Sequence, residues 1–300
     1  MTIEAAAPAP ALAPAGTSPR RRSVPPRERV VGGVSQVVLV AGVIVVALPF
    51  LWTVMSSFKT SREIFASPFA PPTKPNFVNY VNAWTQAGIG TFFVNTLIVV
   101  GGALVLTMVL GAMCAYYLAR FEFRGNRIIY WLMVAGLTFP IFLAIVPLFF
   151  ILKGIGLLGT LPGLAITYAA FALPFTVFFL VPFFKELPRS VTEAAQIDGA
   201  GEWRTFFSVM VPMAMPGLST VAILNFVGLW NQFLLPVALN TDSHRYVLTQ
   251  GMASFASQAG YSIDFGALFA AVVMTVLPVL IVYLLFQRAL SGSIAIGTDK

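Results

Sequence analysis

Charge is scarce in this 300-residue chain. Only 10% of its residues are Asp, Glu, Lys or Arg, whereas an ordinary soluble domain carries about a quarter. Hydrophobic residues make up 58% of the chain, and the mean hydropathy is +0.87. This composition excludes a soluble globular protein and indicates an integral membrane protein. The net charge of +7 would suggest a nucleic-acid partner in a soluble protein. A membrane protein uses basic residues first to set its orientation, so we expect no nucleic-acid partner here.

Cysteine, histidine and nucleotide-binding motifs are nearly or wholly missing. Cys114 is the single cysteine, which excludes an internal disulfide and a cysteine metal cluster. The only histidine, His244, is expected in a loop, and no HExxH motif or pair of carboxylates falls inside an apolar block. Lys59 is the only lysine followed by Ser or Thr, and Phe58 rather than glycine precedes it. We therefore expect no catalytic residue, metal or bound cofactor, and any ATP must be bound by a partner subunit.

What the chain does have is long apolar runs. Each exceeds about 20 residues, enough for a helix to cross a hydrocarbon core about 30 Å thick. The blocks cover residues 34–55, 91–118, 128–152, 163–184, 213–240 and 264–287. They predict an all-α membrane protein with six transmembrane helices over 34–287, a disordered N-terminal arm over 1–33 and a tail over 288–300.

The charged residues lie outside these blocks or at their ends. A proton-coupled carrier, ion pump or voltage sensor normally keeps ionisable groups at membrane depth, so this distribution argues against a stand-alone secondary carrier, which stays as an alternative. Thirteen of the 18 basic residues fall in one alternate set of segments and five in the other. The positive-inside rule then places the chain in the cell membrane with both termini in the cytoplasm.

Proline and glycine interrupt the apolar blocks. Gly101, Gly102 and Gly111 permit close approach of a neighbouring helix, and the prolines predict kinks that suit a gated path. These prolines are Pro49, Pro140, Pro147, Pro174, Pro182, Pro216, Pro236 and Pro278.

One segment between the fourth and fifth blocks is unusually polar. Residues 193–212 read EAAQIDGAGEWRTFFSVMVP and hold three acids, one arginine and two glycines. Ser190 and Glu193 have the spacing of a capping box, which predicts that a short helix begins at Ser190. Gly199 and Gly201 supply a turn, after which a second helical segment can run from Glu202 to near Pro212. A helix so short gains most of its order by packing on something else.

This segment resembles the EAA loop of the inner-membrane permeases of ABC importers. Glu193, Ala194 and Ala195 are followed by Gly199 and, after nine residues, by Val209, Val211 and Pro212. The triplet Asp198, Gly199 and Ala200 is similar to the carbohydrate-uptake branch, in particular to its maltose-type subunit with six spans. Three other segments resemble the same family: Ser57–Ile64 with Asn79 and Tyr80, the pair Trp230–Asn231, and Gln287–Gly297, where Ile296 stands in place of a common lysine.

The resemblance implies the type I ABC importer permease fold and a set of partners. The helix around Glu193 to Ala200 would dock in a groove on a cytoplasmic ABC ATPase dimer, with Glu193 facing a basic residue. A second permease, a related but different chain, would complete the pathway, and an extracytoplasmic solute-binding protein would dock on the outer loops Ser56–Gly90 and Thr241–Ile263.

The expected substrate is a sugar or oligosaccharide. Amide side chains and one aromatic face are the groups that a sugar ring would use in an apolar channel. Residues of this kind in the blocks are Asn95, Asn225, Trp230, Asn231 and Gln232. An ABC permease for a non-sugar solute remains a second reading.

Overall fold

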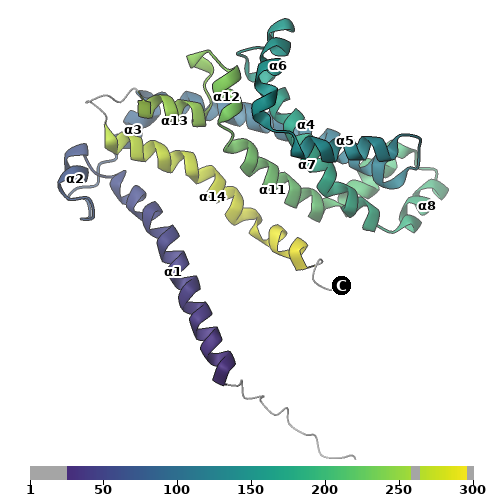
Figure 1. The fold of residues 1–300 in the computed structure, drawn as a ribbon, viewed down its shortest axis with the longest axis horizontal. Helices are drawn as coiled ribbons and strands as arrows, with labels where there is room; N and C mark the ends of the chain where they lie inside the picture. Colours follow the sequence, from purple (N-terminus) through teal and green to yellow (C-terminus); the bar gives the residue numbers. More distant parts are fainter. Residues whose placement is uncertain (1–25, 258–263, 296–300) are drawn as a thin grey trace, which may run out of the picture. The chain divides into compact units, whose positions relative to one another are not determined.

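The computed structural model describes residues 26–257 and 264–295, and it divides the chain into two units, residues 1–51 and 52–300. Within the described residues, every regular element is a helix (Figure 1). The elements are α1 (Pro26–Ser56), α2 (Ser61–Ala66), α3 (Val78–Thr85), α4 (Ile89–Arg120), α5 (Asn126–Thr138), α6 (Ile141–Gly154), α7 (Leu161–Glu186), α8 (Arg189–Ile197), α9 (Glu202–Thr205), η1 (Phe206–Met210), α10 (Val211–Met213), α11 (Met215–Trp230), α12 (Leu234–Leu239), η2 (Ser243–Arg245), α13 (Leu248–Ser257) and α14 (Phe265–Ala295).

Four of the predicted spans are single helices, namely α1, α4, α7 and α14. The other two are bent pairs of helices, and each bend lies at or near a proline, Pro140 or Pro216, for which the sequence predicted a kink. Block 128–152 consists of α5 and α6, which meet at an angle of 105°. Pro140 stands at this break, where it has no amide hydrogen to donate and cannot continue the preceding helix. Block 213–240 ends its long helix at Trp230 and restarts as the short α12, and α11 itself meets the segment Glu202–Met213 at 78°. The described chain thus has four spanning helices, or six if each bent pair counts as one.

The predicted ends of the membrane domain also shift. Helix α1 begins at Pro26, so residues 26–33 of the expected N-terminal arm are helical. Helix α14 runs on to Ala295, beyond the predicted end of the last span. Residues 1–25 and 296–300 of the predicted arm and tail lie outside the described residues.

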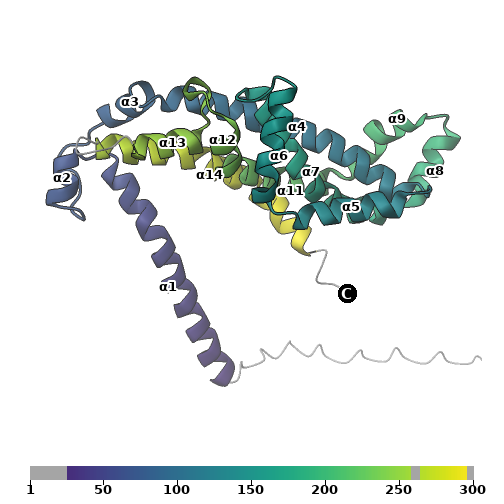
Figure 2. The ribbon, with the colours of Figure 1, turned by 45° about the horizontal axis from the view of Figure 1, so that its top comes forward.

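Helices α4 and α7 form the centre of the second unit, and Figures 1 and 2 show them side by side. Gly111 on α4 lies where a Cβ atom would collide with Thr176 of α7, whereas an added Cβ at Gly101 would meet nothing within 4 Å. Of the three glycines expected to allow close packing, Gly111 is therefore the one where a side chain would prevent it. Helix α11 packs against both α4 and α7.

Two clusters of buried side chains fill this unit. One gathers around Tyr168, Trp230 and Leu248, at the end where α4 and α7 begin. The other gathers around Tyr116, Phe184 and Phe206, at the end where α4 and α7 finish. We refer to these as the α3 end and the α8 end, after the helices that lie there in Figures 1 and 2.

The α3 end is held by a buried hydrogen-bond network centred on Lys59, which is 1% exposed. The Lys59 Nζ donates to the carbonyl oxygens of Ser67 and Pro68, at 3.0 and 3.1 Å. Asn79 Nδ2 donates to the carbonyls of Ser57 and Lys59, both at 2.8 Å. Gly266 allows α14 to pass close against the Asn79 side chain and the Lys59 carbonyl, where a Cβ would collide with both. The expected outer loop 56–90 is therefore a folded element fixed to the start of α14.

Helix α2 carries a capping box that the sequence analysis did not single out. The Thr60 side chain accepts from the Glu63 amide, and the Glu63 carboxylate accepts from the Thr60 amide at 3.1 Å. Hydrogen bonds from Thr73 and then Thr60 hold the pKa of Glu63 below its ordinary value. This box further orders the segment between α1 and α3.

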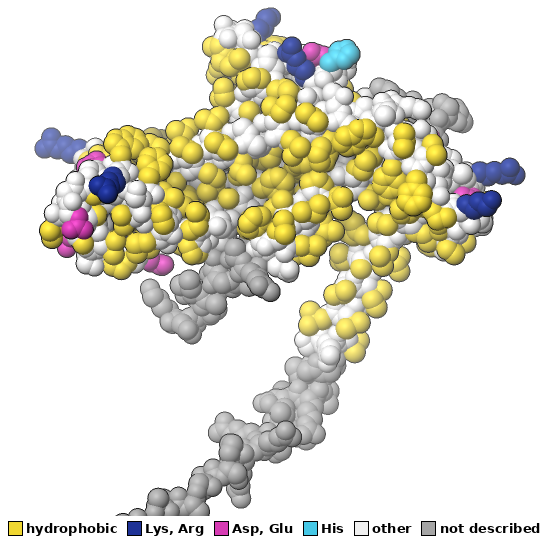
Figure 3. All heavy atoms as spheres, turned by 180° about the vertical axis from the view of Figure 1, so that it is seen from behind, with side chains coloured by type: hydrophobic (Ala, Val, Ile, Leu, Met, Phe, Trp, Pro, Cys, Tyr) yellow, Lys and Arg dark blue, Asp and Glu magenta, His cyan; other side chains and the backbone are white. Residues whose placement is uncertain are grey.

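Charge and apolar surface are separated on the face drawn in Figure 3. Its middle is covered by hydrophobic side chains, while Lys, Arg, Asp and Glu gather toward the ends and edges. Exposed apolar surface of this extent is typical of side chains that face lipid or another membrane subunit.

Candidate coupling loop and substrate path

The N-cap of helix α8 lies two residues before Ser190, the N-cap expected from the capping box. Pro188 is its N-cap, Arg189 is its first residue, and no side chain caps it. The predicted capping box of Ser190 and Glu193 is therefore wrong. Pro188 fixes the backbone φ at −59°, next to the first helical residue, so the turn forms without a side-chain acceptor.

The far end of α8 closes as the glycines predict. Gly199 adopts φ +74°, the left-handed conformation that glycine accepts without a Cβ penalty. Its amide donates to the Gln196 carbonyl at 3.0 Å, and the Ala200 amide donates to the Ala195 carbonyl at 2.9 Å. These two bonds form a Schellman motif that stops the helix. Gly201 is extended at φ −67°, so only the first of the two glycines needs the left-handed region.

The second half of the loop is a continuous helical segment with an unusual centre. Residues Glu202–Met213 comprise α9, the π-helical turn η1 and α10. Phe206 and Met210 are buried in the cluster formed with Tyr116 and Phe184 of α4 and α7. This segment therefore anchors the loop of residues 189–213, hereafter the α8–α10 loop, to the membrane helices.

Two side-chain contacts reinforce the anchor. Arg120, at the end of α4, donates from Nη2 to the Leu187 carbonyl at 2.7 Å, immediately before α8. The Thr192 hydroxyl lies 3.8 Å from the Met210 sulfur, between α8 and η1. Sequence reasoning used Arg120 only as an orientation signal and did not predict its contact, because no local spacing relates it to Leu187.

The side chains left outside form a mixed surface. Glu193 is exposed and makes no hydrogen bond or ion pair with any described residue. Ile197 is 86% exposed and Trp203 is 66% exposed, and the Trp203 ring stacks on Phe207 with an interplanar angle of 11°. Apolar side chains this exposed beside a free carboxylate are typical of a contact surface.

The remaining residues predicted for the loop divide into exposed and half-buried ones. Ala194, Asp198 and Pro212 are exposed, whereas Ala195 and Ala200 are half-buried. Glu193 and Ala194 lie four and three residues before Ile197 on α8, so each is a neighbour of Ile197 on the helix surface and one partner groove can contact all three.

Two of the five predicted path residues line a common cavity. Asn225 and Gln232 border a space of about 340 Å³ between α5, α6, α7 and α11. The Asn225 Nδ2 donates to the Thr176 hydroxyl at 2.7 Å. Four aromatic rings share the lining, and sequence reasoning did not predict them, because phenylalanine in an apolar block gives no distinguishing signal. They are Phe139, Tyr168, Phe171 and Phe175.

The other three predicted residues lie elsewhere. Asn95 is buried and donates to the carbonyls of His244 and Tyr246, at 3.2 and 3.0 Å. Trp230 is 2% exposed and donates from Nε1 to the Thr275 carbonyl of α14 at 3.1 Å. Asn231 is exposed and bonds back to its own helix at Val227. In the structure described, these contacts stabilise helix packing and the α3 end.

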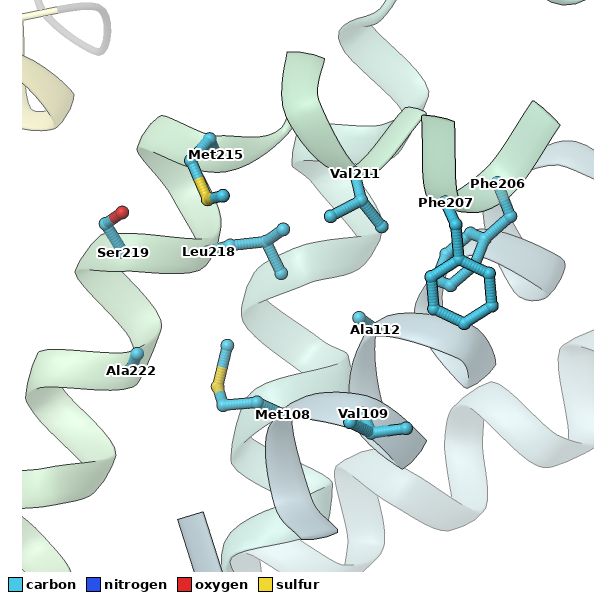
Figure 4. A pocket seen from close by; sticks show the side chains of 10 residues that line it. All are labelled: Met108, Val109, Ala112, Phe206, Phe207, Val211, Met215, Leu218, Ser219 and Ala222. Atoms are coloured by element: carbon cyan, nitrogen blue, oxygen red, sulfur yellow. The ribbon is translucent and has the colours of Figure 1, made fainter. Parts of the chain in front are cut away.

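An apolar groove of about 320 Å³ lies beside the α8–α10 loop, between α4, η1 and the start of α11. Figure 4 shows Met108 and Leu218 converging on it, with Phe206 and Phe207 at one side. The α11 residues Met215, Leu218 and Ala222 line this groove, and Asn225 and Leu229 line the cavity. Their spacing of three or four residues places them along one face of α11, so one helix face connects the groove with the cavity.

Comparison with known proteins gives consistent matches. The family model described as "Binding-protein-dependent transport system inner membrane component" matches residues 107–295, which include the α8–α10 loop. The diacetylchitobiose uptake system permease protein of Streptomyces coelicolor is 60% identical over 279 residues, covering 93% of this chain and 92% of that protein. The trehalose transport system permease protein of Mycobacterium tuberculosis is 33% identical over 253 residues, covering 84% of this chain and 92% of that protein.

A solved structure shows the same fold. A chain of a bacterial ABC transporter involved in import of the acidic polysaccharide alginate superposes with a TM-score of 0.77 at 22% identity. The match covers 89% of this chain and 98% of that one. A second chain, from the alginate transporter in complex with an alginate pentasaccharide-bound periplasmic protein, superposes with a TM-score of 0.66 at 13% identity.

Proposed function

Because this chain belongs to the family of binding-protein-dependent transport system inner membrane components, we propose that it is the permease subunit of an ATP-driven sugar importer. It forms half of the translocation path and couples to a separate ATPase. The observation that carries the proposal is the α8–α10 loop, an exposed helix closed by a Schellman motif and anchored to the core by Phe206 and Met210.

The ATPase contacts the exposed side of α8. Glu193, Ala194 and Ile197 enter a groove on the ATPase, as an amphipathic helix fills a groove in other complexes, and Glu193 pairs with a basic residue there. Arg120 and the buried aromatic cluster join the loop to α4 and α7, so displacement of the loop also displaces these helices. ATP binding and hydrolysis in the partner then favour different openings of the bundle.

A second permease completes the path. The chain carries one EAA-like loop, whereas an ATPase dimer presents two docking sites. Supporting this, the groove between α4, η1 and α11 offers an apolar surface that adjoins the loop and continues along α11 to the cavity. A helix of the second permease lies along this face.

The orientation follows from the basic residues. A cytoplasmic α8 end is supported by Arg120, Lys185, Arg189 and Arg204, which lie there, because the positive-inside rule associates basic residues with the cytoplasmic side. The α3 end then faces outward, both termini are cytoplasmic, and the folded segments 56–90 and 241–257 meet the solute-binding protein.

The substrate is a sugar or oligosaccharide. The relatives at 60% and 33% identity are named for diacetylchitobiose uptake and trehalose transport. Supporting this class, the cavity combines the amides of Asn225 and Gln232 with four aromatic rings, the groups that bind the hydroxyls and the apolar faces of sugars.

Charge reversal at Glu193 tests the coupling. The variant Glu193→Lys places a cation opposite the basic groove, so ATP-driven uptake in proteoliposomes should fall about 10-fold or more, equivalent to about 1.4 kcal/mol. The ATPase should also be lost from the affinity-purified complex, while membrane insertion stays normal.

The matched control is Glu122→Lys. Glu122 is also an exposed glutamate at the α8 end, in the turn between α4 and α5. It should retain both uptake and bound ATPase. Normal uptake by Glu193→Lys would contradict the assignment, and uptake by the purified chain without an ATPase would favour a stand-alone carrier instead.

A further inference from the structure

A second cavity, separate from the proposed substrate path, lies at the α3 end. It measures about 280 Å³ and is bordered by α3, the start of α4, α13 and the start of α14. Its polar lining consists of Asn82, Gln86, Ser254 and Asp264, and the rings of Phe92 and Phe255 complete it. We call it the outer hollow.

Three polar groups of the outer hollow are available to a ligand. The Asp264 Oδ1 accepts from the Ala267 amide at 3.1 Å and from the Ser61 hydroxyl at 3.5 Å. Its other carboxylate oxygen has no hydrogen-bond partner among the described residues, and neither do the side-chain amides of Asn82 and Gln86. Because Asp264 is held through one oxygen, the other has a fixed position.

The aromatic wall is fixed as well. The Phe92 ring occupies the space where a Cβ of Gly251 would lie, and it passes 3.2 Å from a Cβ built on Gly88, which has φ +73°. Two glycines therefore confine the ring between α13 and the turn before α4. A ring held in this way offers a flat apolar surface without losing side-chain entropy on binding.

The lining selects one ligand chemistry. Among the described residues, no lysine or arginine borders the outer hollow, so a phosphate or a uronate would meet the Asp264 carboxylate without compensation. A cation such as Ca²⁺ takes six to eight oxygen ligands, and among the described residues no group of three or more His, Cys, Asp or Glu could hold a metal. Amides that both donate and accept, one carboxylate oxygen and a flat ring match the hydroxyls and apolar face of a neutral sugar.

We propose that the outer hollow binds one unit of a neutral sugar before it enters the path between α5, α7 and α11. The inference rests on the proposed function and deepens it, since it adds a second contact point and excludes acidic sugars. The volume of about 280 Å³ is close to the lower limit of small-ligand pockets, about 300 Å³, which is consistent with a single sugar unit.

Photo-crosslinking of the intact transporter in lipid nanodiscs tests the inference. The probes are diazirine derivatives of diacetylchitobiose and trehalose, with a diazirine-bearing oligouronate as the acidic comparison. We expect at least one neutral probe to label peptides of α3 or α13, mapped by mass spectrometry, and the oligouronate to leave them unlabelled.

Two variants and a control locate the contact. In Asn82→Leu and in Gln86→Leu, the concentration for half-maximal labelling should rise about 3- to 10-fold, the effect of one lost hydrogen bond. Thr85→Val is the control, because Thr85 lies on the same helix, bonds its own Val81 carbonyl and does not border the hollow.

The outcomes separate this inference from the proposed function. The outer hollow is overturned as a sugar site if the concentration for half-maximal labelling in both leucine variants equals that of the wild type. It is also overturned if no probe labels α3 or α13 while the same complex takes up either sugar with ATP. If the wild-type complex takes up none of the tested sugars with ATP, the proposed function is overturned instead.

Discussion

A buried lysine shows how one residue fixes a whole segment. Among the described residues, Lys59 has no acidic partner, and its ammonium group donates to the carbonyl oxygens of Ser67 and Pro68. Hydrogen bonds from a charged donor contribute more than neutral ones, about 1.5 to 3 kcal/mol each. The Pro68 carbonyl also accepts from Trp52 Nε1 at 2.8 Å, so the same turn is held from two directions.

Replacing this lysine should destabilise the segment 56–90. Lys59→Met keeps the apolar stem but removes the donors. We therefore expect the free energy of unfolding to fall by about 2 to 4 kcal/mol, which would be measured as a lower midpoint of thermal unfolding in detergent. Lys74→Met is the control, since Lys74 is exposed in the same segment, and its midpoint should change little. Equal midpoints for the two variants would show that the Lys59 bonds contribute nothing.

At the scale of elements, some features of the α8–α10 loop follow from its local sequence and others from its packing against distant helices. Its helix–turn–helix form follows from Gly199, because only glycine adopts φ +74° without strain. The start of α8 was mispredicted, because Pro188 ends α7 and sets the first turn of α8 without a side-chain cap. The bend of 78° before α11 lies between Pro212 and Pro216, and a kink was predicted at Pro216. The π-helical turn η1 had no signal in the spacing, since it depends on how Phe206 and Met210 fit between α4 and α7.

The two glycines of this loop form a natural pair for a test. Neither has any atom within 4 Å of an added Cβ, but Gly199 has φ +74° and Gly201 has φ −67°. Gly199→Ala should lower the free energy of unfolding by about 1 kcal/mol, because an alanine is strained in this turn, and it should also lower ATP-driven uptake. Gly201→Ala should leave both nearly unchanged. Thermal unfolding and proteoliposome uptake of both variants measure this, and similar losses in the two would exclude backbone strain as the cause.

On the face of the described chain drawn in Figure 3, charged side chains gather toward the ends and edges, as the scarcity of charge in the apolar blocks predicted. The hydrogen bonds that close the α3 end join segments far apart in the chain. Arg245 donates to the Gly159 carbonyl at 3.0 Å, and the Thr96 hydroxyl accepts from the Leu248 amide at 2.7 Å. The segment after α12 is therefore fixed to the turn before α7 and to α4.

Thiol labelling of intact cells tests the orientation of the whole chain. In a Cys114→Ser background, Ser190→Cys should react with a membrane-impermeant maleimide only after permeabilisation, because we propose that the α8 end is cytoplasmic. Ser257→Cys should react in intact cells, since it lies at the α3 end. Both serines are exposed, so accessibility alone does not distinguish them. Reversed labelling would overturn the orientation and, with it, the ATPase contact at Glu193.

The sequence by itself determined the membrane class, the approximate positions of the spans, the family and the location of the EAA-like loop. These depend on composition, apolar length and local motifs, which are properties of short stretches of chain. Only the tertiary structure decided that Asn225 and Gln232 share a cavity while Asn95 and Trp230 hold the packing together. The same amide can face a cavity or satisfy a distant carbonyl, and which of these occurs depends on the neighbouring helix, because a buried polar group must find a partner wherever the fold places one.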